Sequence, residues 1–268
     1  MKAEHIAIIG GGNLGASIAE GLVQTHFISP EAITVTRRKT RLIQHLAELG
    51  INISNNNVEA AAKADIVIVA VQPKQMHDVL LEIRPILDPE KHVLISTAAG
   101  FTIRDIREVV GNKVSVMRAM PNTAIAIQQS MTCIASDNSS DEQKEMVTSL
   151  FDKLGKTAFI EEDLMESATA LGACGIAFAL RYIRATTQGG IEIGFEADLA
   201  QLIATQTVKG AASLLLEKSR HPEEEIDKVT TPRGCTIAGL NEMEHQGFSS
   251  ALIKGVITSY SKIAKLQD

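Results

Sequence analysis

The stretch Gly10–Gly15, with the sequence GGGNLG, constrains the fold of this chain more than any other. It follows the apolar run His5–Ile9, which is typical of a buried parallel strand. Leu14, Ile18 and Leu22 then repeat at helical spacing. A strand, a glycine turn and a helix in this order are typical of a dinucleotide-binding site, and a purely structural glycine turn is the alternative.

Three of the glycines have separate expected roles. Gly10 allows the tight turn after the strand, and Gly12 lets a pyrophosphate approach the backbone. Gly15 lets the helix pack close to the strand. The free N–H groups at the start of the helix face the anion. The stretch therefore predicts a dinucleotide cofactor.

The end of the second strand predicts which dinucleotide is bound. A strand at residues 32–36 and a helix at 40–49 complete a βαβ unit. NAD-binding versions carry an Asp or Glu at the end of this strand, whereas here Thr36, Arg37 and Arg38 stand there. Guanidinium groups suit a 2′-phosphate, so we expect NADPH and leave the use of NADH open. A solvated charge cluster is the structural alternative.

Strands and helices alternate as far as Glu161, which predicts an α/β domain with a Rossmann doubly wound sheet over residues 1–161. The β-branched run Ile66–Val71 is typical of a central strand buried on both faces. Ligands of such sheets lie at the carboxyl ends of strands, where Gln72–Lys74 and Thr97–Gly100 follow. Further strands are expected at 51–53, 92–96, 114–119, 131–135 and 157–160, and helices at 57–63 and 140–154.

From Glu162 the alternation stops, and an all-helical domain is expected over residues 162–268. The helix around Leu171–Ala177 is apolar almost all round and rich in small residues, so it should be buried against close neighbours. Helices with such faces suggest an intertwined homodimer. The helices are expected at 163–187, 196–219, 223–229, 236–245 and 249–265.

Composition argues against several classes of protein. The 268 residues have a net charge of −6 and 3% aromatic residues, which disfavours a nucleic-acid partner. The longest uncharged apolar run, Ser167–Leu180, is too short for a membrane span. No signal-peptide pattern fits into Met1–Glu4, and the three cysteines lack zinc or disulfide spacing, so a cytoplasmic location is expected. The seven histidines show no ligand spacing, so no metal is expected.

The segment Thr231–Leu240, with the sequence TPRGCTIAGL, is the most informative part of the second half. Its proline and glycine indicate a turn, and the following residues begin a helix whose first N–H groups are free to hold a carboxylate. Thr236 is a candidate for that chemistry. Its structural alternative is to cap the helix as the N-cap residue.

Four segments together resemble Δ1-pyrroline-5-carboxylate reductase, the last enzyme of proline biosynthesis: Gly10–Gly15, Ala98–Gly100, Arg118–Thr123 and Thr231–Leu240. The resemblance runs in order over nearly the whole chain. It implies an oxidoreductase that transfers a hydride from NAD(P)H to the C5 carbon of a cyclic imine and so acts on a C=N bond.

The resemblance also implies the roles of individual residues. Gly234, Cys235 and Thr236 bind the substrate carboxylate through backbone N–H groups, and the Thr236 hydroxyl lies near the ring nitrogen as the catalytic group. An ordinary hydroxyl has no suitable pKa for a general acid, so Thr236 is expected to orient the imine or relay a proton. The expected cofactor contacts are Gly10, Gly12, Asn13, Leu14, Gly15, Thr36, Arg37, Arg38, Asn57, Val71, Gln72, Pro73, Ala98, Ala99, Met120, Pro121 and Asn122.

In this family the substrate loop comes from the partner subunit, so the resemblance implies a homodimer, and many members assemble further into decamers. The chain departs from the family pattern at Cys174, Ile176, Arg184 and Arg233. These departures leave alternatives open: another imine reductase or a β-hydroxyacid reductase of the same two-domain architecture, or a non-catalytic NADP-binding regulatory relative.

Overall fold

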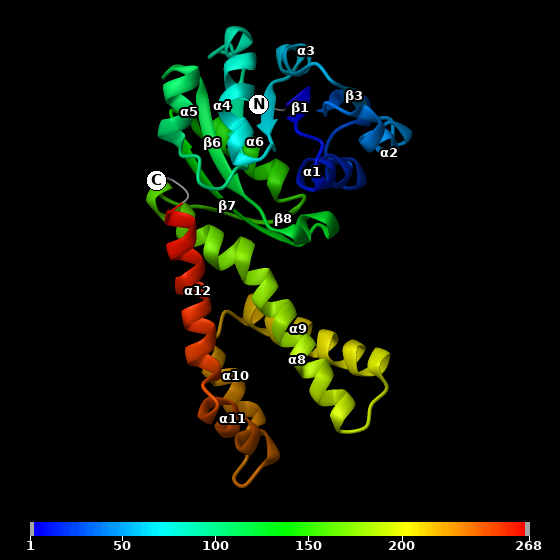
Figure 1. The fold of residues 1–268 in the computed structure, drawn as a ribbon, viewed down its shortest axis with the longest axis vertical. Coiled ribbons are helices and arrows are strands. Elements are labelled where there is room, and N and C mark those ends of the chain that lie inside the picture. The colour runs from blue at the N-terminus through cyan, green and yellow to red at the C-terminus, as the bar shows by residue number, and fades with distance from the viewer. Residues whose placement is uncertain (1–2, 266–268) are drawn as a thin grey trace. The chain divides into compact units, whose positions relative to one another are not determined.

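The computed structural model describes residues 3–265, which form two compact units (Figure 1). The first unit holds the chain up to Cys174 together with the segment from Ser259 onward, and the second holds Gly175–Thr258. The sheet ends before Glu161, the expected last residue of the first domain. That domain boundary stays a prediction, because compact units and functional domains are different divisions of a chain.

The centre of the first unit is an eight-stranded sheet with the order β3-β2-β1-β4-β5-β6-β7-β8. The strands are β1 (Ile6–Ile9), β2 (Ile33–Thr36), β3 (Asn52–Ser54), β4 (Ile66–Val69), β5 (Val93–Ser96), β6 (Ser115–Met120), β7 (Ser130–Asp137) and β8 (Gly155–Phe159). The pairs among β1 to β6 are parallel, and Ile6 of β1 lies between Ile33 of β2 and Ile66 of β4. β7 runs antiparallel to β6, and β8 runs parallel to β7.

Helices cover both faces of this sheet. Successive side chains of a strand point to opposite faces, so each face carries apolar side chains that pack against helices and form a core. Ile8 packs with Leu22 and Leu150 in one core, and Ile9 packs with Leu80 in the other. The expected doubly wound sheet is therefore confirmed. The helices are α1 (Asn13–Gln24), α2 (Gln44–Glu48), α3 (Asn57–Lys63), α4 (Pro73–Ile83), α5 (Ile103–Val110), α6 (Asp141–Phe151) and α7 (Met165–Ala168).

Four segments of the first unit differ from the sequence prediction. The helices α4 and α5 were not among those expected. Instead of one helix at 40–49, the chain forms a 3-10 turn, Thr40–Ile43, followed by α2. The strand expected at 66–71 ends at Val69, because the chain turns there toward Pro73, whose fixed φ suits the first position of α4.

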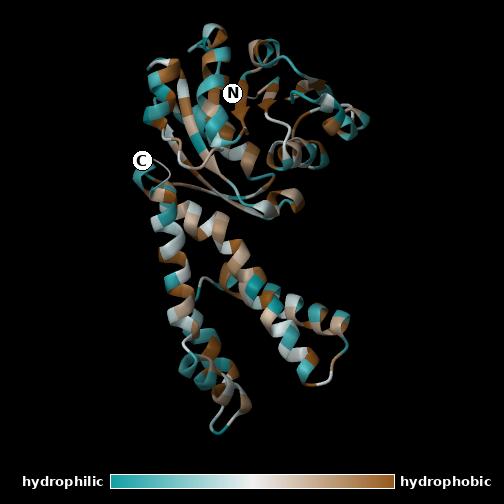
Figure 2. Cartoon of the chain, viewed as in Figure 1, coloured by the Kyte–Doolittle hydropathy of each residue, from teal (hydrophilic) through white to brown (hydrophobic). Residues whose placement is uncertain are grey.

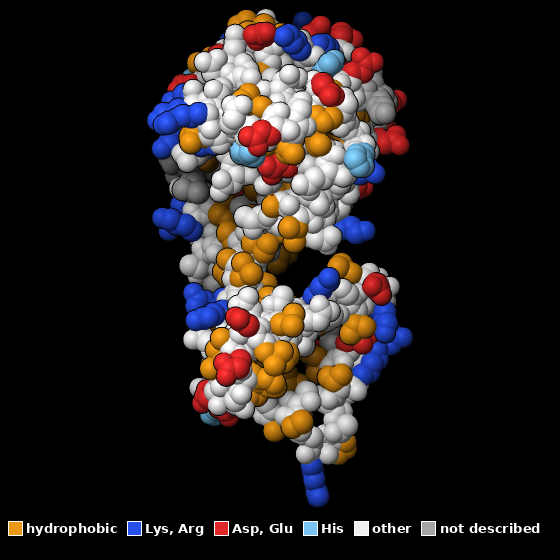
Figure 3. Space-filling model, turned by 90° about the vertical axis from the view of Figure 1, so that its right-hand side faces the viewer, with side chains coloured by type: hydrophobic (Ala, Val, Ile, Leu, Met, Phe, Trp, Pro, Cys, Tyr) orange, Lys and Arg blue, Asp and Glu red, His pale blue; other side chains and the backbone are white. Residues whose placement is uncertain are grey.

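The second unit is helical and leaves much apolar surface exposed. Its helices are α8 (Gly175–Glu192), α9 (Ala197–Lys218), α10 (Pro222–Val229), α11 (Cys235–His245) and α12 (Phe248–Ala264), whose last turns belong to the first unit. α8 packs along α9, where Thr187, Ala200 and Ala204 are buried. Leu202 and Leu216 of α9 are nevertheless 65% and 76% exposed. Figure 2 colours many residues along these helices as hydrophobic, and the space-filling view in Figure 3 shows apolar side chains at the surface.

A π-helical segment, Thr169–Cys174, joins α7 to α8. Leu171 in this segment is 70% exposed, so the chain itself does not provide the burial expected for residues 171–177. The apolar run 167–180 lies inside a longer helical stretch, 162–192, that is long and apolar enough to cross a membrane by length and composition. The expectation of no membrane span therefore stays a prediction.

Candidate active site

The glycine turn between β1 and α1 has the geometry of a phosphate cradle. The N–H groups of Gly10 and Gly11 donate to the carbonyl oxygen of Thr36 over 3.1 and 2.7 Å, which ties the turn to the end of β2. Gly12 is the N-cap of α1, and no side chain in the described part of the protein caps this helix. The first N–H groups of α1 are thus available to an anion.

Contacts of the glycines match their expected roles. Gly10 has a φ of 111°, and a Cβ atom there would lie 2.5 Å from the carbonyl oxygen of Ala70. A Cβ atom on Gly15 would lie 2.2 Å from the carbonyl oxygen of Gly10, so only glycine allows this close approach of helix and turn. Gly12 faces open space, where a pyrophosphate would fit. The residues present therefore fit a dinucleotide.

The end of β2 is cationic, as the sequence predicts. Nη1 of Arg37 donates to the carbonyl oxygen of Gly11 over 2.8 Å, which holds this half-buried guanidinium against the glycine turn. Arg38 is exposed and forms no ion pair among residues 3–265. The hydroxyl of Thr36 donates to Oδ1 of Asn57 over 2.6 Å. Two arginines directly after β2, one of them held against the glycine turn, suit a 2′-phosphate.

The remaining expected cofactor contacts lie at or just beyond the carboxyl ends of β4, β5 and β6. Because the carboxyl ends of parallel strands share one edge of a sheet, these residues come together with the glycine turn at that edge. They are Val71, Gln72, Pro73, Ala98, Ala99, Met120, Pro121 and Asn122. The amide of Asn122 is already engaged: it accepts from the N–H of Ala124 and donates to the carbonyl oxygen of Gly172.

The candidate substrate loop lies in the second unit and begins with a tight turn. The N–H of Gly234 donates to the carbonyl oxygen of Thr231 over 2.8 Å, with Pro232 and Arg233 between them. Arg233 has a φ of 63°, the left-handed conformation that the third position of a type II turn requires. Glycine is favoured there, so Arg233 introduces backbone strain at this departure from the family pattern.

The N-cap role considered for Thr236 is wrong. α11 begins at Cys235, and Gly234 is its N-cap, because the turn places the first helical residue directly after it. The half-buried hydroxyl of Thr236 forms no hydrogen bond within the described chain and remains a free donor. The N–H of Gly234 is used in the turn, so the free backbone donors at the start of α11 are those of Cys235, Thr236 and Ile237.

Sequence reasoning missed a buried charge cluster on β6. The Arg118 side chain is 1% exposed, and its Nη1 lies 2.7 Å from Glu162 and 3.6 Å from Glu166. Oε1 of Glu162 also accepts from the N–H of Ile103, the first residue of α5. Because its partners lie 44 residues or more along the chain, no local pattern in the sequence indicates this cluster. It joins β6 to the first turns of the helical region.

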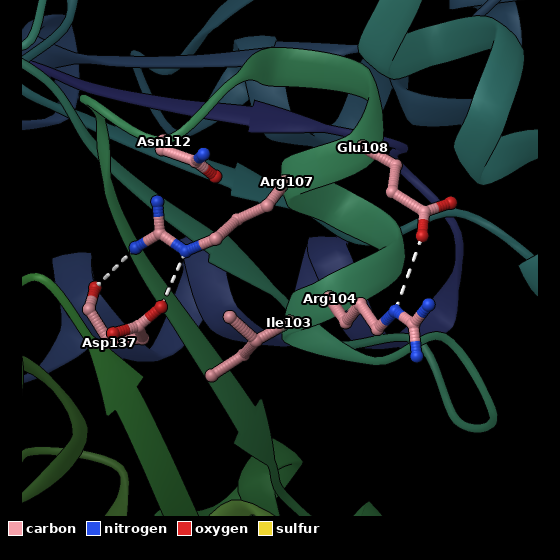
Figure 4. A pocket seen from close by; sticks show the side chains of 6 residues that line it. All are labelled: Ile103, Arg104, Arg107, Glu108, Asn112 and Asp137. Atoms are coloured by element: carbon pink, nitrogen blue, oxygen red, sulfur yellow. Dashed lines mark hydrogen bonds and ion pairs between the residues drawn. The ribbon is translucent and has the colours of Figure 1, made fainter.

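A surface hollow of about 420 Å³ lies away from the predicted site residues (Figure 4). Both arginines in its lining form ion pairs with carboxylates: Arg107 with Asp137, and Arg104 with Glu108. None of the residues predicted to bind cofactor or substrate lines this hollow. Within residues 3–265 no group of three or more His, Cys, Asp or Glu side chains is arranged to hold a metal ion.

Comparison with known proteins then decides the family. Residues 162–266 match the family model described as pyrroline-5-carboxylate reductase dimerisation, and residues 5–100 match NADP oxidoreductase coenzyme F420-dependent. The chain is 46% identical to pyrroline-5-carboxylate reductase 2 of Dictyostelium discoideum, over 98% of this chain and 93% of that protein. This chain belongs to the pyrroline-5-carboxylate reductase family.

Other members of the pyrroline-5-carboxylate reductase family extend the comparison. Pyrroline-5-carboxylate reductase 1 of Dictyostelium discoideum is 48% identical over 97% of this chain, and the chain spans about half (49%) of its length. The Coxiella burnetii pyrroline-5-carboxylate reductase structure has a TM-score of 0.92 with 28% identity and covers 99% of both chains. The Plasmodium falciparum pyrroline carboxylate reductase, solved with NADP bound, has a TM-score of 0.88 with 25% identity over 98% of both chains.

Proposed function

We propose that this chain is an NADPH-dependent oxidoreductase that reduces the C=N bond of Δ1-pyrroline-5-carboxylate to give L-proline. The observation that carries this assignment is the 46% identity over 93% of the length of a pyrroline-5-carboxylate reductase. The free hydroxyl and N–H donors at the start of α11 give the substrate a place in this chain. The change from glycine to Arg233 leaves that donor set intact.

In this proposal one group of residues binds the cofactor and a second group binds the substrate. When bound, NADPH supplies the hydride. The N–H groups at the start of α1 hold the pyrophosphate, and Arg37 and Arg38 hold the 2′-phosphate. The N–H groups of Cys235 and Thr236 bind the substrate carboxylate. The Thr236 hydroxyl hydrogen-bonds the ring nitrogen: it donates to the neutral imine, and its oxygen accepts from the N–H of the protonated imine. A protonated imine is already electrophilic, so the residues mainly position the reacting carbon.

The working form in this proposal is a homodimer in which each subunit's loop 231–240 completes the site of its partner. Two observations support it: the dimerisation family model over residues 162–266 and the exposed apolar side chains of the helical unit. A second copy that covers those side chains also accounts for the apolar stretch 162–192 without a membrane. We therefore propose a cytoplasmic enzyme with no membrane contact, whose dimers are able to form decamers.

The test is NADPH oxidation by the purified protein with and without Δ1-pyrroline-5-carboxylate, with L-proline identified as the product. NADH is run in parallel. Substrate-dependent oxidation at about 1 to 1000 per second is expected, with higher kcat/KM for NADPH. Binding of NADPH without oxidation would overturn the substrate assignment, and equal kcat/KM with both cofactors would overturn the preference for NADPH.

A further inference from the structure

A carboxylate lies beside the end of β2, although the sequence of that strand end contains none. The hydroxyl of Thr36 donates to Oδ1 of Asn57 over 2.6 Å, and Nδ2 of Asn57 donates to Oε2 of Glu82 over 2.8 Å. Glu82 belongs to the last turn of α4 and lies 25 residues beyond Asn57 in the chain. The three side chains form a relay that starts where a Rossmann sheet binds the ribose 2′ position.

Neither the helix nor ion pairing accounts for the position of Glu82. A negative charge in the last turn of a helix faces the negative end of the helix dipole, which disfavours it there. Among residues 3–265, no Lys, Arg or His forms an ion pair with Glu82. Within residues 3–265 this carboxylate accepts a hydrogen bond from Asn57 and is otherwise exposed to solvent.

The relay fixes the orientation of the Asn57 amide. A carboxylate can only accept hydrogen bonds, so the group that faces Glu82 must be the NH₂ of Asn57. The hydroxyl of Thr36 donates to the other amide atom, which must then be the oxygen. One N–H of Asn57 remains without an assigned partner in the relay. An N–H donor suits an oxygen of a 2′-phosphate, whereas a carbonyl oxygen in that place would repel it.

We propose that Glu82 is a positioning residue for the cofactor, which acts through Asn57 by keeping an amide N–H directed at the 2′ end of the dinucleotide. This inference rests on the proposed NADPH site. It concerns cofactor binding alone, so it is independent of which imine is reduced.

The experiment measures the Kd of NADPH and of NADH through the fluorescence of the nucleotide itself, because the chain contains no tryptophan. Glu82→Ala is expected to weaken NADPH binding about 3- to 10-fold, the effect of one hydrogen bond, and to weaken NADH binding less. Glu82→Gln keeps an acceptor oxygen and should stay closer to the wild type. Asp78→Ala is the matched control, since Asp78 is another exposed carboxylate of α4 but does not contact Asn57.

A double-mutant cycle separates action through Asn57 from other effects. If Glu82 acts through Asn57, the Glu82→Ala/Asn57→Ala double variant binds NADPH as weakly as Asn57→Ala alone. Additive effects, or unchanged or tighter NADPH binding by Glu82→Ala, would overturn the proposal. Equal melting temperatures of the variants exclude loss of folding as the cause.

The outcome of this experiment differs from that of the activity test. A wild-type protein that binds NADPH but does not reduce Δ1-pyrroline-5-carboxylate overturns the proposed substrate and leaves the Glu82 measurement intact. A wild-type protein that binds no NADPH overturns the inference together with the cofactor assignment.

Discussion

The hydroxyl of Thr236 is free to bind a ligand because Gly234, two residues earlier in the chain, is the N-cap of α11. Because Gly234 is the N-cap of α11, Thr236 occupies the first turn and its hydroxyl is not used to cap the helix. A Cβ atom on Gly234 would lie 2.6 Å from Oγ1 of Thr231, so a larger residue could not take over the N-cap position without moving the turn. The turn thereby keeps one side-chain donor available for a ligand.

Thr236→Ala is therefore expected to lower kcat about 10- to 100-fold, the effect of losing a hydrogen bond to a charged or reacting group. The Kd of NADPH should stay within about 2-fold of the wild type, because the predicted cofactor contacts lie elsewhere in the chain. Thr236→Ser keeps the hydroxyl and serves as the matched control. Steady-state kinetics and nucleotide binding measure both quantities. Full activity of Thr236→Ala would remove this residue from the site.

His92 gives the fold a pH dependence that is separate from catalysis. This buried side chain accepts a hydrogen bond from the N–H of Asp88 at Nδ1 (2.7 Å), and its Nε2 lies 3.2 Å from the carbonyl oxygen of Ala61. Burial lowers the pKa of His92, and the charge of Lys91 adds to this effect. Protonation would also remove the lone pair that accepts from Asp88.

The native state therefore binds fewer protons at His92 than the unfolded state does. The free energy of unfolding should fall as the pH drops below about 6.5, the pKa of an unfolded histidine. Denaturant unfolding at pH 7.5 and at pH 5.5 measures this loss. His92→Gln removes the titrating group, so its stability should change less between the two pH values. An equal change in both proteins would assign the acid sensitivity to other groups.

Two glycine-to-alanine substitutions in the turn between β1 and α1 should have different effects, one on stability and the other on NADPH binding. A Cβ atom on Gly15 would meet the backbone of Gly10, whereas one on Gly12 would meet open space. Gly15→Ala is expected to lower the melting temperature, because helix and turn must separate. Gly12→Ala should keep the wild-type melting temperature and weaken NADPH binding about 10-fold or more, because its methyl group occupies the place of the pyrophosphate. Thermal melts and nucleotide titrations of the two variants test this contrast, and a Gly12→Ala variant with normal NADPH affinity would contradict it.

Periodicity predicts the central elements of this chain well because their signals are local. The β-branched residues of β4 and the glycine turn after β1 each lie within one short window of sequence. The direction of β7 is different, since it depends on the short connection after Met120 that brings the chain back beside β6. Periodicity within a strand carries no information about that direction.

The same distinction applies to the candidate site. The sequence indicates Arg37 because the end of β2 has a fixed place in a βαβ unit. The contacts of Glu82 and Arg118 could not be predicted from local patterns, because their partners Asn57 and Glu162 lie 25 and 44 residues away in the chain. Contacts of this kind are made by tertiary packing alone. The N-cap of α11 is a further example. Threonine is favoured at N-cap positions, but the hydrogen bond from Gly234 to Thr231 closes the turn at Gly234, which therefore becomes the N-cap in place of Thr236.

At the scale of the whole molecule, the helical unit exposes many large apolar side chains, and contiguous exposed apolar surface is typical of an interaction site. Leu202 and Leu216 lie roughly four turns apart on α9 and so share one face of this helix. A homodimer that buries this face is destabilised by charges placed on it, because an unpaired buried carboxylate is strongly unfavourable.

Leu202→Glu/Leu216→Glu should therefore sediment as a monomer at micromolar concentration, while the wild type sediments as a dimer or a larger assembly. Leu42→Glu is the matched control: Leu42 is 49% exposed on the sheet unit, so the same change there should leave the assembly intact. The double variant should also lose activity while it keeps its affinity for NADPH, because the loop 231–240 would no longer reach a partner subunit. A wild-type monomer, or a double variant that remains assembled, would show that this face of α9 is not the interface. Flotation of the wild type with lipid vesicles would instead assign the apolar stretch 162–192 to a membrane surface.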